Sequence, residues 1–277
     1  MKFFHITIAF TLTLLLLGCT NLKEVQGFAG QSAALSGYTE LTTRFRDTYY
    51  REQPYVSGEA AQLAQQNDAR RKAAYEDLLK IHQTAALYMQ TLAKLAGDKS
   101  FDVSPNIDSL SSGIKSYPEL GIDKTQADAV SGLAKILAKW VTSSYQQYAV
   151  RDFIKEGNEP LQTTLDGMKK LVDYYQKTNE NEWKTINGLL EVELSFVDES
   201  DPKLLATLAR AHQQTKAFEY ELADKKYLEA KKGIQTIAKG HQLLFDNLDK
   251  LSKQEIKDSL KQFSRDIKDI NKHIESM

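Results

Sequence analysis

The sequence predicts an all-α protein, an elongated antiparallel helical bundle, and three observations support this fold class. Apolar residues recur at steps of three and four along most of the chain, which is the period of an amphipathic helix. The chain holds only five prolines, and most of them stand where a helix would begin. No useful stretch alternates apolar and polar residues as a half-buried strand does.

The composition of the 277 residues is that of a globular protein, and it excludes several classes of function. Lys and Arg number 36 against 37 Asp and Glu, a net charge of −1. This balance argues against the basic surface that nucleic-acid binding needs. One cysteine cannot form a disulfide framework or a zinc site of four cysteines.

The N-terminus has the layout of a secretory signal peptide. Lys2 precedes a mostly apolar run over residues 3–17, and a small residue, Gly18, follows it. The run is shorter than the ~20 residues that a helix needs to cross a bilayer. We therefore expect residues 1–18 to be a signal peptide.

Leu16-Leu17-Gly18-Cys19 resembles the lipobox of bacterial lipoproteins, and this resemblance covers residues 1–19 only. It implies cleavage between Gly18 and Cys19 and a diacylglyceryl group on the thiol of Cys19. An ordinary cleaved signal, or an uncleaved anchor, is the alternative interpretation. Thr20 rather than Asp follows the cysteine, which in Gram-negative lipoproteins implies the outer membrane, facing the periplasm. Residues 19–24 would then be the acylated N-terminus and a short tether.

Residues 25–156 are expected to form an N-terminal helical region. Apolar and aromatic residues recur at helical steps over residues 25–50 and again over 60–96. Residues 97–121, rich in Gly, Pro and Ser, predict a long connection. A helix capped by Asp123 is expected next, up to residue 155.

Residues 157–277 are expected to form a C-terminal helical bundle. Gly157-Asn158 would separate two helices, and Pro160 can stand in the first turn of the second. One continuous bundle, or two sub-bundles meeting near residues 157–160, would both fit. The most regular stripe has the alternating steps of a bundle seam; it comprises Leu161, Leu165, Met168, Val172, Tyr175, Asn179, Trp183, Ile186, Leu190, Leu194 and Val197.

Further stripes follow, and short links between them imply antiparallel neighbours. After Asp201-Pro202, one stripe is expected to face inward; it comprises Leu204, Leu208, Ala211, Thr215, Phe218 and Leu222. A helix over about residues 224–250 and a last helix over residues 256–274 complete the chain. Ser252 and Glu255 have the spacing of a capping box for the last helix.

Sequence motifs typical of catalytic or metal-binding sites are weak or missing. The chain has neither phosphate-binding glycine motif, and no histidine has an acidic residue three positions before it. His241 lies on an apolar stripe and is expected to be a buried neutral core residue. The basic run Arg70-Arg71-Lys72 is expected to be a solvated helix face. The sequence thus predicts no enzyme, no cofactor and no metal site.

One segment is dense in the residue types that dominate protein interfaces. Residues 44–55 contain its candidate partner-binding residues, which are Arg44, Arg46, Tyr49, Tyr50, Arg51 and Tyr55. Adjacent residues on a helix point about 100° apart, so Tyr49 and Tyr50 cannot both face one core. Packing at a corner between helices is the alternative interpretation.

These features favour a lipid-anchored, non-enzymatic binding or scaffold module at the periplasmic face of the outer membrane. Its partners would be the membrane, through the lipid on Cys19, and another protein of the envelope. An immunity or inhibitor-type lipoprotein that neutralises a toxin or an envelope enzyme is the alternative. The sequence does not indicate an oligomeric state.

Overall fold

The computed structural model describes residues 22–34, 36–97, 113–141, 149–197 and 203–277. Helices dominate these ranges, and no strand occurs in them beyond one isolated bridge between Tyr117 and Ile122. The predicted all-α helical bundle is confirmed. The expected signal peptide, Cys19 and most of the expected connection at 97–121 lie outside the described residues.

The stretch expected as helical over residues 25–50 is divided into three helices. They are α2 (Lys23–Ser32), α3 (Ser36–Arg46) and α4 (Thr48–Glu52), followed by a 3-10 turn, η2 (Gln53–Tyr55). The division lets α2 pack on both α5 and α10 while α3 and α4 pack on α5 and α8.

The next elements are longer. Helix α5 (Gly58–Leu95) covers the predicted range and ends where Gly97 was expected to end it. A 3-10 turn, η4 (Pro118–Leu120), precedes α7 (Lys124–Val141). Asp123 caps α7 as predicted, because its carboxylate accepts the Thr125 amide proton at 2.7 Å.

The predicted helix break at Gly157-Asn158 is wrong, because α8 (Ala149–Ser195) runs through it with Pro160 inside. Gly157 is needed for packing, since a Cβ there would overlap the ring of Tyr88. Asn158 is buried and donates its amide proton to Gln242 Oε1 at 3.0 Å. Both residues therefore join α8 to its neighbours.

Two further boundaries differ from the prediction. Helix α9 (Lys203–Asp246) is one helix where two were expected, and α10 (Gln254–Ser276) completes the chain. The predicted capping box does not form, because the N-cap of α10 is Lys253 and no side chain caps it.

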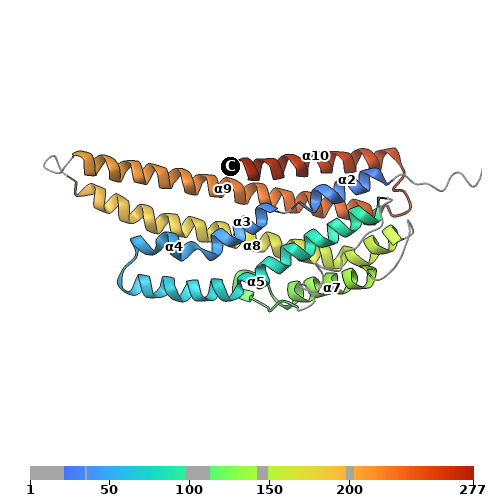
Figure 1. Ribbon diagram of the computed structural model, residues 1–277, viewed down its shortest axis with the longest axis horizontal. Helices are drawn as coiled ribbons and strands as arrows, with labels where there is room; N and C mark the ends of the chain where they lie inside the picture. The colour runs from blue at the N-terminus through green and yellow to red at the C-terminus, as the bar shows by residue number, and fades with distance from the viewer. Residues whose placement is uncertain (1–21, 35, 98–112, 142–148, 198–202) are drawn as a thin grey trace, which may run out of the picture.

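Helices α8 and α9 lie side by side and form the spine of an elongated bundle (Figure 1). At one end α2, α5, α7 and α10 surround this pair, and the described chain begins there. At the other end α8 and α9 extend furthest, and α10 stops midway along α9 (Figure 1). Residues from both sides of position 157 share one hydrophobic core.

Candidate functional site

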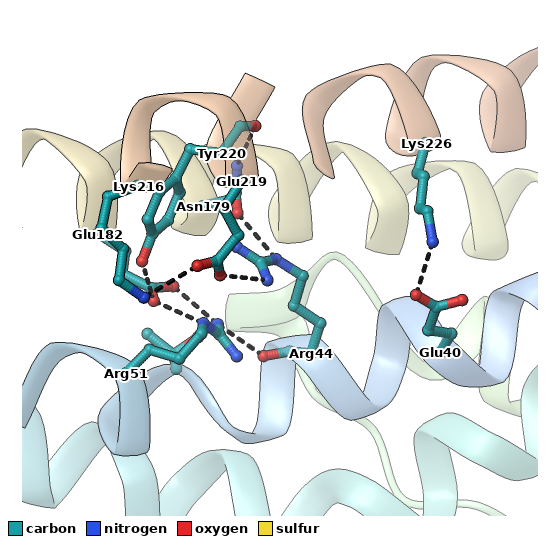
Figure 2. A network of polar contacts seen from close by, with 10 residues as sticks. Glu40, Arg44, Arg51, Asn179, Glu182, Lys216, Glu219, Tyr220 and Lys226 are labelled. Atoms are coloured by element: carbon teal, nitrogen blue, oxygen red, sulfur yellow. Dashed lines mark hydrogen bonds and ion pairs between the residues drawn. The ribbon is translucent and has the colours of Figure 1, made fainter. Parts of the chain in front are cut away.

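The predicted partner-binding segment lies on α3, α4 and η2, against the middle of α8 and α9. Its two central arginines, Arg44 and Arg51, turn inward and bind side chains of those helices (Figure 2). Their guanidinium groups are therefore bound inside the bundle and are not presented on its surface.

Arg51 forms the most buried ion pair of the described residues. Its Nε and Nη2 donate to the two carboxylate oxygens of Glu182 at 2.7 and 2.8 Å, while the Glu182 side chain is only 1% exposed. The Tyr220 hydroxyl also donates to this carboxylate. Burial works against the charged form of Arg51, yet the hydrogen bond and the charge of Glu182 outweigh it and raise the pKa of Arg51.

Arg44 continues the same network toward α9. It donates from Nε to Asn179 Oδ1 and from Nη1 to Glu219 Oε1, both at 3.1 Å. Lys216 donates to the other oxygen of Glu219 at 2.9 Å (Figure 2). Burial alone would raise the pKa of Glu219, but the bonds from Lys216 and Arg44 lower it below its ordinary value.

The other four candidate residues lie outside this network. Arg46 pairs with its neighbour Asp47 at 2.7 Å, and Tyr49 accepts a hydrogen bond from Gln65. The Tyr55 hydroxyl contacts His212 Nε2 at 2.6 Å. Tyr50 is 80% exposed, which makes it the clearest contact residue of the six.

A cavity of about 310 Å³ lies directly beside the Arg51–Glu182 pair. It opens between α4, α5, α8 and η4, and Glu182 is part of its wall. Its full lining comprises Phe45, Thr48, Glu52, Asn67, Arg70, Arg71, Glu119, Leu120, Tyr174, Thr178, Asn181, Glu182 and Thr185. Burial raises the pKa of Glu52 and lowers that of Arg71.

The expectation that Arg70-Arg71-Lys72 forms a solvated face is wrong for Arg71, whose side chain is 10% exposed. Arg71 stands on the stripe that continues as Ala74, Leu78 and Ile81, so the helical period already placed it inward. Glu182 was missed in the same way, because the predicted seam passed through its neighbour Trp183.

A second candidate surface is the distal end, which we define as residues 188–197, from the last turns of α8 to just beyond its end, and residues 203–211 of α9. None of its residues is buried. Its exposed large apolar side chains are Leu189, Val192, Phe196, Leu204, Leu205 and Leu208. The expectation that the stripe beginning at Leu204 faces inward is therefore wrong for this part of α9.

Two histidines, His82 and His241, are buried in the bundle. His241 lies between the Tyr88 hydroxyl and the Asn158 amide oxygen, at 2.9 Å from each. His82 is buried with no hydrogen-bond partner for its Nε2 among the described residues. Burial lowers the pKa of His82 to about 4 and that of His241 to about 3, so both are neutral at pH 7.

Within the described ranges, no group of three His, Cys, Asp or Glu residues could hold a metal ion. No described helix is both long and apolar enough to cross a membrane. Comparison of the chain with protein-family models, curated proteins and solved structures found no match.

Proposed function

We propose that this chain is a lipid-anchored, non-enzymatic binding protein of the cell envelope, and that its distal end holds a helix of another envelope protein. The observation that carries the proposal is the exposed apolar surface of the distal end. Exposed apolar clusters on otherwise well-packed proteins mark sites of interaction. This proposal moves the partner-binding surface away from Arg44 and Arg51, which are engaged inside the bundle.

The spacing of the exposed residues favours a helical partner. Leu204, Leu208, Ala211, Thr215 and Phe218 follow one another at steps of four and three, and all five are exposed. This alternation is the one by which helices pack side by side. Because α10 ends midway along α9 (Figure 1), none of the described helices covers this stretch on that side.

The position of the anchor supports a tethering role. The described chain begins at Leu22, three residues after Cys19, at the end of the bundle opposite to the distal end. Helix α9, with its 44 residues, is about 66 Å long at 1.5 Å per residue. A lipid on Cys19 would therefore hold the distal end well away from the membrane surface. Confinement at the membrane would raise the effective concentration of the distal end near its partner.

The anchor is tested by replacing Cys19 with Ser in the host cell. Loss of palmitate labelling and of membrane attachment is expected, because the thiol is the acylated group. We expect Thr20→Asp to keep the lipid and to shift the protein from the outer to the inner membrane, as the lipoprotein resemblance implies. Membrane attachment that is unchanged in Cys19→Ser would contradict the proposal.

The binding role is tested with a photo-reactive amino acid placed at Leu208 in the full chain, in cells. The matched control carries it at Lys239, an exposed residue of the same helix beside α10. The proposal expects one discrete adduct at Leu208 whose cross-linked peptide maps to a helix of an envelope protein, and none at Lys239. An adduct of twice the chain's own mass would instead indicate self-association. A secreted toxin in the adduct would favour the inhibitor hypothesis.

A further inference from the structure

We propose that the end of the bundle at which the described chain begins docks on the headgroup layer of a phospholipid bilayer, with the long axis of the bundle pointing away from the membrane. We call this surface the anchor end and define it as residues 22–23, 150–152 and 248–253. The inference rests on the proposed function, since it requires a lipid on Cys19. It goes further because it assigns a lipid-contacting surface to the folded chain and an orientation to the bundle.

The anchor end is formed by three segments that are far apart in the sequence. They are the start of α2, the first turn of α8, and the turn between α9 and α10 (Figure 1). A cavity of about 50 Å³ lies where the three segments meet, since Leu22, Val150 and Leu251 all line it. The three segments therefore lie side by side at this end of the bundle.

The chain between the lipidated residue and the bundle is short. Leu22 is 8% exposed and belongs to the hydrophobic core, so its place in the bundle is fixed. Leu22 follows Cys19 by three residues, which span at most about 11 Å at ~3.6 Å per residue. A diacylglyceryl group would hold Cys19 at the level of the glycerol backbones, beneath a headgroup layer about 5–8 Å thick. Leu22 therefore cannot lie more than a few ångströms beyond the headgroups, and exposed side chains of the anchor end reach them.

The exposed charges of the anchor end suit zwitterionic headgroups, which carry a phosphate and an ammonium group. Both signs are present, and the charged residues are Lys23, Arg151, Asp152, Asp249, Lys250 and Lys253. Glu24 and Glu255 lie directly beside this surface in the sequence. Arg151 and Asp249 bind each other at 3.1 Å, with side chains 52% and 86% exposed. Because an ion pair this exposed is weak, both residues can exchange it for headgroup charges.

The helices beside the anchor end offer no apolar face along which the bundle could lie on the bilayer. None of the exposed large apolar side chains of the described residues is on α2, α7 or α10. A helix lies in a membrane interface by burying such a face. Most of the exposed large apolar side chains are at the distal end or elsewhere on α9. A tether at the anchor end thus favours an upright bundle, with the distal end free for its partner.

The two tryptophans of the chain can report this orientation. Trp140 lies near the anchor end, since its indole nitrogen donates to Glu156, in the first turns of α8, at 3.3 Å. Trp183 lies about 50 Å along α8 from the first residue of that helix, at 1.5 Å per residue, close to the distal end. An upright bundle therefore separates the two indole rings widely in their distance from the membrane.

The test attaches the mature chain, residues 19–277, to phosphatidylcholine vesicles through its only cysteine, Cys19, and a diacylglycerol that carries a maleimide. Resonance energy transfer to dansyl-labelled headgroups is measured for two matched variants. Trp183→Phe retains Trp140, and Trp140→Phe retains Trp183. We expect transfer from Trp140 to be several-fold stronger than transfer from Trp183.

A control lengthens the tether with a flexible Gly-Ser segment between Thr20 and Asn21. A segment of about 20 residues has a root-mean-square length of about 25 Å and should lower the transfer from Trp140 at least about twofold. Equal transfer from the two tryptophans would show that the bundle lies along the bilayer. Weak transfer from both, or no effect of the longer tether on Trp140, would show that the short tether does not press the anchor end onto the headgroups. Each of these results would overturn the inference. Because the lipid is attached chemically, they are separate from the Cys19→Ser test of the proposed function.

Discussion

The distal end can be compared with the body of the bundle, by which we mean the described residues outside the distal end. The same spacing of leucines occurs in both regions, but the leucines are buried in the body and exposed at the distal end. Leu161 and Leu165 of α8 are 0% and 1% exposed, whereas Leu204 and Leu208 of α9, also four residues apart, are 70% and 57% exposed. The helical period thus identifies the side of a helix that is suited to packing. It does not identify the chain that packs against it.

The polar groups show the same contrast. In the body, Glu182 and His241 are buried and each contacts more than one partner. At the distal end the described polar side chains are exposed or half-buried. Substitutions in the body should therefore change the stability of the isolated chain, whereas those at the distal end should change its binding.

The largest effect is expected at the buried ion pair. Glu182→Ala should lower the free energy of unfolding by about 3–5 kcal/mol, because it leaves the Arg51 guanidinium buried and unpaired. The double variant Arg51→Met with Glu182→Leu should recover most of this loss. Urea unfolding followed by circular dichroism measures both. A double variant no more stable than Glu182→Ala would show that the pair is not coupled.

The leucines provide the most direct comparison between the two regions. Leu165→Ala removes a fully buried side chain and should cost about 2–5 kcal/mol. Leu208→Ala, on an exposed face, should change the stability of the isolated chain by less than about 0.5 kcal/mol. The same unfolding curves test this. Equal losses at the two positions would mean that the distal end is buried in solution.

The buried histidines make the stability of the body dependent on pH. The pKa of His82 falls to about 4 in the folded state, against ~6.5 when unfolded. Below pH 6.5 protons therefore bind the unfolded chain preferentially, and stability is lost as the pH falls. Between pH 6.5 and 5.0 this histidine should cost about 2 kcal/mol, at ~1.4 kcal/mol per pH unit.

The contribution of His82 is isolated by measuring urea unfolding of the wild type and of His82→Gln at both pH values. The variant should lose about 2 kcal/mol less than the wild type over this interval. Its absolute stability at pH 6.5 does not enter the comparison. Parallel pH dependences of the two proteins would contradict the assignment of a depressed pKa to His82.

Two glycines of α8 extend the comparison between the two regions. Gly157→Ala should cost about 1–3 kcal/mol, because the new methyl group would overlap the Tyr88 ring. Gly188→Ala, where nothing lies within 4 Å of the added Cβ, should stabilise the chain by about 0.5–1 kcal/mol through helix propensity. The thermal unfolding midpoints of the two variants are compared with that of the wild type. If both move in the same direction, Gly157 and Gly188 do not differ in packing as the structure indicates.

The sequence was sufficient for the all-α fold and for most of the helices, because hydrophobic spacing is a local signal. It failed at Gly157-Asn158, where residues typical of a helix end serve close packing on Tyr88 and His241. Such contacts join residues more than 60 positions apart, and no local pattern encodes them.

The candidate sites were predicted less well than the fold. Residue types drew attention to Arg44 and Arg51 as candidates for partner binding, whereas the structure pairs both with side chains of α8 and α9. These side chains are distant in sequence, so the sequence alone could not distinguish pairing within the chain from binding to a partner. The burial of Arg71 was not predicted, because the run Arg70-Arg71-Lys72 suggested a solvated face. Its position on the stripe that continues as Ala74 and Leu78 nevertheless agrees with burial. The apolar stripe that begins at Leu204 and Leu208 was predicted to face inward, but both side chains are exposed. The spacing of the stripe is suited to helix packing, but it does not indicate whether a helix of the same chain lies against it.

No described residue of the distal end belongs to the hydrophobic core of the bundle, so we expect the core to be stable without it. This expectation is tested most directly by replacing residues 188–211 with a short Gly-Ser turn, next to the hydrogen bond between Gln213 and Asn187, and by measuring the thermal unfolding midpoint. We predict a decrease of no more than about 2–4 °C, equivalent to ~1 kcal/mol for a chain of this size. A decrease of about 10 °C or more would show that these residues stabilise the body and would contradict the account.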